Sequence, residues 1–137
     1  MSVELVIVTP SGEAYRGEVE RVVLPGSEGD FGVLEGHERF LCSLRTGEIQ
    51  LTLEGGGSLR AAVAGGFADV GGSEAVVLAE SCETADEIDF ARAEHARTRA
   101  EEALASLDAV ADPERFLEHD AALRRAVNRI LVAEKGL

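Results

Sequence analysis

Short apolar runs separated by turn-forming residues fill the first part of the chain. Segments rich in glycine, proline and polar residues stand between the runs. Within residues 48–54 polar and apolar residues alternate strictly, which is typical of a strand with one buried and one solvated face. Many short strands with turns roughly every 8–12 residues predict a sandwich or flattened barrel. The runs occupy residues 5–8, 19–24, 31–34, 40–44, 49–53, 59–64, 67–70 and 75–79.

Helical spacing replaces this pattern in the last third of the chain. Alanines and leucines recur every three or four positions between residues 93 and 107, and a second apolar stripe runs from residue 116 to residue 131. Asp112 followed by Pro113 is a helix-start signal, because Asp caps the first turn and Pro fits the first helical position. The link over residues 106–111 is short. The two helices are therefore expected to fold back as an antiparallel hairpin.

Composition divides the chain at the same place. Fourteen of the fifteen glycines lie at or before Gly72, whereas thirteen of the twenty alanines lie at or after Ala85. Glycine disfavours helices and alanine favours them. The sequence therefore predicts an α+β protein, with an all-β unit at residues 1–84 and an α-helical hairpin at residues 85–137.

The predicted interface between the two helices buries little apolar area. On the first helix it consists mostly of alanine, which removes little apolar area from water at ~25 cal/mol per Å². An isolated hairpin of this kind is marginal. We expect it to dock on the β unit, on a partner, or alternately on both.

Charge and length exclude several classes of partner. The formal net charge is −13, from 26 acidic and 13 basic residues. This charge repels nucleic acid and anionic lipid, so no nucleic-acid partner is expected. No apolar run approaches the ~18 residues that a membrane-spanning helix needs, so direct membrane insertion is not expected. The start, Met1 to Glu4, lacks the features of a signal peptide, and we expect a cytoplasmic protein.

Candidate catalytic chemistry is sparse. Cys42 and Cys82 are expected to be reduced thiols, and no spacing typical of a metal site occurs. His37 and Cys42 allow a small hydrolase as a remote alternative, although a separation of five positions is weak support. The glycines between residues 26 and 32 resemble a phosphate loop but lack its lysine and carry two acids. No catalytic residue and no metal ligand is predicted.

Two charged features have more than one interpretation. The acidic loop with Glu28 and Asp30 is either a solvated turn or a charged surface for a basic partner. The arginines of the hairpin either pair with nearby acids or form a cluster that grips an anion, and Arg125 and Arg129 share one helix face. The hairpin arginines are Arg92, Arg97, Arg99, Arg115, Arg124, Arg125 and Arg129.

Five segments stand out along the chain. One is the loop LPGSEGDFGVLEGH of residues 24–37. The others are VIVTPSG (6–12), AGGFADV (64–70), VVLAE (76–80) and IDFARA (88–93). Taken in chain order, they resemble the epsilon subunit of the rotary F-type ATP synthase, bacterial type, from end to end, and the loop is the most diagnostic of the five.

The resemblance implies a flattened sandwich of about ten strands followed by the two-helix hairpin. It implies a non-catalytic subunit in the central stalk, which couples and regulates. The sandwich would bind the gamma subunit and the c-subunit ring, with Glu28, Asp30 and His37 facing the polar loops of that ring. The complex would lie on the cytoplasmic face of the bacterial plasma membrane, as a peripheral assembly.

The resemblance also implies a regulatory hairpin. The hairpin would lie folded on the sandwich, or open towards the alpha and beta subunits of the catalytic head and block ATP hydrolysis. No cofactor is required, but ATP would stabilise the folded state as a regulatory ligand. The matching positions are Glu83, Ile88, Asp89, Arg92, Ala93, Arg125 and Arg129. The alternative function is a stand-alone β-sandwich interaction module whose helical hairpin dimerises it.

Overall fold

The computed structural model describes residues 2–36 and 38–136. All strands precede both long helices, so the predicted α+β organisation is confirmed. The strands are β1 (Val3–Thr9), β2 (Gly12–Gly26), β3 (Gly29–Val33), β4 (Phe40–Leu53), β5 (Ser58–Gly71), β6 (Glu74–Ala79) and β7 (Cys82–Thr84). A short 3₁₀ turn, η1 (Ala85–Glu87), leads into α1 (Phe90–Ala105) and α2 (Pro113–Lys135).

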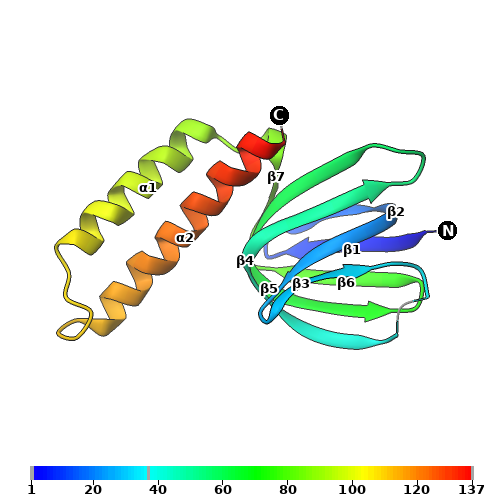
Figure 1. The fold of residues 1–137 in the computed structure, drawn as a ribbon, viewed down its shortest axis with the longest axis horizontal. Coiled ribbons are helices and arrows are strands. Elements are labelled where there is room, and N and C mark those ends of the chain that lie inside the picture. The colour runs from blue at the N-terminus through cyan, green and yellow to red at the C-terminus, as the bar shows by residue number, and fades with distance from the viewer. Residues whose placement is uncertain (1, 37, 137) are drawn as a thin grey trace.

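The strands form one sheet that closes on itself. Its order is β1-β6-β5-β4-β2-β3, and β1 also pairs with β2, while β7 pairs with β5. The β1–β6 pairing is parallel, and the other pairings are antiparallel. Closure leaves few unpaired strand edges, which limits edge-to-edge association. Figure 1 shows this flattened barrel beside the helical hairpin.

The expectation of about ten strands was wrong, because the described residues form seven. The apolar runs 40–44 and 49–53 belong to the single strand β4, and the runs 59–64 and 67–70 belong to β5. The inward-facing position changes from even to odd between Leu44 and Ile49. The glycines between these runs therefore bend long strands and do not end them.

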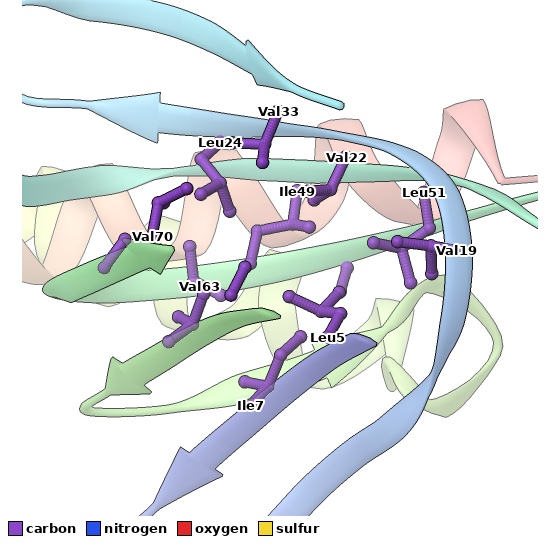
Figure 2. Close-up of a cluster of buried hydrophobic side chains, with 14 of the residues drawn as sticks. Leu5, Ile7, Val19, Val22, Leu24, Val33, Ile49, Leu51, Val63 and Val70 are labelled. Carbon is purple, nitrogen blue, oxygen red and sulfur yellow. The ribbon is translucent and has the colours of Figure 1, made fainter. Parts of the chain in front are cut away.

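Aliphatic side chains fill the interior of the barrel. Figure 2 shows side chains from several strands, among them Leu5, Leu24 and Ile49, converging on this core. Burying one such side chain contributes about 1.5–3 kcal/mol. The core cluster draws none of its members from the hairpin, so the barrel has a complete core of its own. Its large, fully buried members include Leu5, Ile7, Leu24, Ile49 and Leu51.

Local hydrogen bonds define where the hairpin begins. The Thr84 backbone N–H donates to Glu87 Oε1 at 3.0 Å, which is the hydrogen bond from the N-cap backbone in a capping box. Asp89 caps α1, because its Oδ1 accepts from the Arg92 backbone N–H at 3.1 Å. Pro113 stands at the start of α2, as predicted. The junction between barrel and hairpin is thus an ordered turn.

The hairpin lies on the barrel through α2. In Figure 1, α2 runs between α1 and the barrel, and the loop between the helices points away from the barrel. Ala62 and Ala64 of β5 are buried although they are not part of the barrel core, because α2 packs over this outer face. Ala93 and Ala126 are buried in the hairpin. The structure therefore shows the docked arrangement.

The bend in β5 generates a stability prediction. Gly66 has φ 136°, and a Cβ there would lie 2.0 Å from the Leu78 carbonyl oxygen. Gly66→Ala is expected to lower the free energy of unfolding by about 2 kcal/mol or more, through backbone strain and overpacking. Urea denaturation measures this change. Gly72→Ala is the matched control, since its Cβ would meet nothing within 4 Å. Equal unfolding midpoints for the two variants would refute the bend's importance.

Candidate functional site

A cavity of about 240 Å³ lies between the hairpin and the outer face of the barrel. Small side chains form most of its walls, and charged and polar groups stand among them. The polar lining residues are Thr46, Ser81, Glu83, Arg125, Asn128 and Arg129. The apolar lining residues are Ala62, Val63, Ala64, Ala96, Ala122 and Ala126. Alanine leaves room between the elements, so the cavity follows directly from the small residues of this interface.

An ion pair joins α2 to β7 in this cavity. Arg129 Nε lies 2.7 Å from Glu83 Oε1, and Arg129 Nη2 donates to Glu83 Oε2 at 3.1 Å. Both side chains are largely shielded, with exposed fractions of 25% and 35%. Only the Nη2 contact is a hydrogen bond, and the Nε contact adds the attraction of the two charges. Glu83 therefore orients Arg129 within the cavity.

Two further arginines of the predicted site make no ion pair among the described residues. Arg125 lines the cavity and Arg92 is exposed. Arg92 lies one helical turn before Ala96, which also lines the cavity. In a chain of net charge −13, unpaired guanidinium groups on this side of the hairpin are available for an external anion.

The remaining residues of the predicted site have local structural positions. Asp89 caps α1 through the Arg92 backbone, and Ala93 is fully buried in the hairpin. Ile88 is half-buried between η1 and α1. The structure therefore brings Glu83, Arg125 and Arg129 together in the cavity, while the segment from Ile88 to Ala93 forms the start of α1 and does not line it.

Sequence reasoning missed three polar residues of the cavity. Asn128 Nδ2 donates to the Gly47 carbonyl oxygen at 2.8 Å, across 81 positions of sequence. Thr46 and Ser81 come from β4 and from the link before β7. Asn128 lies between two arginines of the predicted site, which was an available signal. Nothing local marks Thr46, because its place depends on where α2 docks.

One acidic residue of the turn, Asp30, forms an ion pair. Asp30 Oδ1 lies 2.6 Å from Arg45 Nη2, and both groups are about half exposed. Glu28 is exposed in the turn between β2 and β3. His37 lies outside the described residues. The Asp30 charge is therefore partly neutralised within the barrel, whereas Glu28 presents its carboxylate to solvent.

The cysteines are poor nucleophiles. Burial raises the pKa of the Cys82 thiol to about 11, and the Glu87 and Glu83 carboxylates add to the rise. Burial and then the Glu28 charge also raise the pKa of Cys42. Within residues 2–36 and 38–136, no group of His, Cys, Asp and Glu side chains has the arrangement of a metal site.

Comparisons with known proteins cover the whole described fold. The family model for the ATP synthase delta/epsilon chain, beta-sandwich domain, matches residues 2–85, and that for its long alpha-helix domain matches residues 86–134. The chain belongs to the ATP synthase delta/epsilon chain family. This membership confirms the resemblance drawn from the sequence. It also confirms that the protein is a non-catalytic subunit.

Individual relatives agree with the family match. The ATP synthase epsilon chain of Syntrophobacter fumaroxidans is 44% identical over 134 residues, which are 97% of this chain and 96% of the relative. The ATP synthase epsilon chain of Bacillus pumilus is 38% identical over 134 residues, which are 98% of both chains. The similarity therefore includes the barrel and the hairpin together.

Solved structures share the fold of this family member. A chain from the Euglena gracilis mitochondrial ATP synthase, described as OSCP/F1/c-ring, has a TM-score of 0.81 at 23% identity, covering 98% of this chain and 81% of that chain. A chain from the central stalk and c ring of the Tetrahymena thermophila enzyme has a TM-score of 0.60 at 14% identity, covering 95% and 97%. In the part of the chain that the structure describes, neither helix is long and apolar enough to cross a membrane.

The raised pKa of Cys82 predicts slow alkylation. At about pH 8 the thiolate fraction is expected to be roughly 200-fold lower than in the unfolded chain, whose cysteine pKa is about 8.5. Because the folded-state pKa is raised, the rate should keep rising towards pH 11. Iodoacetamide labelling of the Cys42→Ser variant, followed by mass spectrometry, measures this rate. A rate that levels off near pH 9 would contradict the shift, and labelling in urea is the control.

Proposed function

We propose that this chain is the central-stalk epsilon subunit of a proton-translocating ATP synthase and couples rotation of the c ring to the catalytic head. We further propose that its hairpin inhibits ATP hydrolysis and that ATP is the ligand of the hairpin cavity. The supporting observation is the convergence of Glu83, Arg125 and Arg129 on one cavity between α2 and the barrel. The proposed setting is the cytoplasmic face of the bacterial membrane.

The charge of this site suits a polyphosphate. Phosphate oxygens accept charge-assisted hydrogen bonds from guanidinium groups, which are stronger than neutral ones. Arg92 and Arg125 hold no acid partner in the described chain, and Arg129 is kept near the cavity by Glu83. ATP bound between the docked hairpin and the barrel would contact residues of both. It therefore favours the docked over the open hairpin by its difference in affinity for the two states.

The barrel is the proposed binding unit for the stalk and the ring. Leu41, Phe67 and Leu78 are exposed on β4, β5 and β6 and offer an apolar surface to the gamma subunit. Glu28, Asp30 and His37 are the proposed contacts with the polar loops of the c ring. The description of the Tetrahymena neighbour as a central-stalk and c-ring structure supports this arrangement.

Arg92 lies one helical turn from Ala96, which lines the cavity, and removing its guanidinium group should weaken ATP binding. A hydrogen bond to a charged group contributes about 1.5–3 kcal/mol, so Arg92→Ala is expected to raise the Kd for ATP about tenfold or more. Isothermal titration calorimetry of the full chain measures this Kd. Arg115→Ala is the matched control, because Arg115 pairs with Asp112 at the other end of the hairpin. The absence of any binding heat in the unmodified chain at millimolar ATP would refute the nucleotide site.

Deleting residues 89–137 should separate binding from inhibition. The barrel core contains no hairpin residue, and α2 covers mainly small side chains such as Ala62 and Ala64, so the shortened chain is expected to fold. It should still associate with gamma, while ATP hydrolysis by the reconstituted complex rises. Co-purification and steady-state hydrolysis rates, with the full chain as control, test both points. Loss of gamma binding would show that the hairpin is an assembly element.

A further inference from the structure

Glu48 on β4 is a shielded carboxylate held between two cations. Its side chain is 12% exposed, and it pairs with Arg60 of the neighbouring strand β5 and with Lys135 of α2. The Lys135 Nζ lies 3.6 Å from Glu48 Oε2, and Oε2 has no hydrogen bond in the described chain. A shielded carboxylate without compensation is costly. Arg60 balances the Glu48 charge at Oε1, and the lysine of α2 places a second cation beside Oε2.

Lys135 lies at the end of α2 that packs against η1, the turn between the barrel and the hairpin. Lys135 is the last residue of α2, and a Cβ on the following Gly136 would lie 2.2 Å from the Cβ of Ala85 in η1. Only a residue without a side chain fits this approach. The end of α2 is thus packed against the turn from which the hairpin departs, with Lys135 over the barrel.

Three polar contacts join α2 to the barrel among the described residues. Asn128 donates to the Gly47 carbonyl, Arg129 pairs with Glu83, and Lys135 pairs with Glu48. The Arg129 contact belongs to the proposed nucleotide site. The Lys135 contact does not, because neither Glu48 nor Lys135 lines that cavity.

We propose that Glu48 and Lys135 form a salt-sensitive latch that holds the hairpin on the barrel independently of the nucleotide site. Arg60 positions the Glu48 carboxylate on the barrel surface. Lys135 is 55% exposed, so water and salt screen its attraction to Glu48. The latch is weak enough to release and specific enough to bias the docked state. The inference rests on the proposed function only in that the hairpin is taken to open.

The latch and the nucleotide act on one equilibrium. The latch sets how much of the chain is docked without ligand, and ATP then shifts that population. The apparent Kd for ATP equals the intrinsic Kd divided by the docked fraction. A change in the latch should therefore alter the docked fraction directly, and ATP affinity only to the extent that this fraction falls.

Distances between spin labels on the two parts measure the docked fraction. Labels at Val110→Cys in the helix–helix loop, which is 90% exposed, and at Ser73→Cys in the β5–β6 turn would report it by pulsed electron paramagnetic resonance. The background carries Cys42→Ser and Cys82→Ser in every sample. The unmodified hairpin is expected to show a docked and an open distance.

The latch predicts a defined pattern of variants. Lys135→Gln should raise the open-to-docked ratio about three- to fivefold at low salt. Near 1 M NaCl, where the Debye length is about 3 Å, the difference should vanish. In a Glu48→Gln background, Lys135→Gln should have no further effect. Arg124→Gln is the control, since it removes one positive charge whose ion-pair partner, Asp120, lies on the same helix.

The outcomes separate the latch from the nucleotide site. The latch is overturned if Lys135→Gln and the unmodified chain have the same open-to-docked ratio. It is also overturned if every variant at high salt shows only the docked distance between the spin labels. If ATP then still narrows the distribution to the docked distance, the nucleotide proposal survives alone. If Lys135→Gln opens the hairpin but ATP moves neither sample, the latch stands and the nucleotide proposal fails.

Discussion

The close approach of α2 to the outer face of β4 and β5 is the contact on which the candidate site depends. Small residues allow it, since Ala62 and Ala64 on the barrel line the same cavity as Ala122 and Ala126 on α2. The same small residues leave the cavity and bring charged groups of the barrel and helix within reach. Because alanine buries little apolar area, polar contacts carry an unusual share of this interface.

The sequence predicted the order of elements and the helix boundaries because these depend on local signals. Asp112 and Pro113 act within a few residues, and α2 begins at Pro113, although the Asp112 side chain makes no capping hydrogen bond. Thr84 with Glu87 and Asp89 act equally locally at the start of the hairpin. The apolar runs 59–64 and 67–70 predict separate strands, because Gly65 and Gly66 between them have the composition of a turn. Only the pairing of β5 with β4 on both sides of the bend shows that the strand continues.

In the candidate site, too, local spacing predicts some residues, whereas others depend on how α2 docks on the barrel. The spacing of Arg125 and Arg129 predicts a shared helix face, and both reach the cavity. By contrast, the contacts of Asn128 with Gly47 and of Lys135 with Glu48 join residues more than eighty positions apart. No periodicity encodes them, because they depend on which face of the barrel α2 covers. Glu48, within the alternating segment 48–54, has the pattern of a solvated residue and is instead shielded.

A thin interface between barrel and hairpin is a requirement of a ligand-controlled switch. A ligand shifts an equilibrium only by its difference in affinity for the two states, and couplings of this kind are about 1–3 kcal/mol. An interface of several buried leucines, at about 1.5–3 kcal/mol each, would exceed that range and hold the hairpin docked whatever the ligand. Ala62, Ala64 and Ala126 keep the apolar term small. Glu83 and Glu48 then add attractions that are small enough for salt to screen and for a bound nucleotide to reinforce measurably.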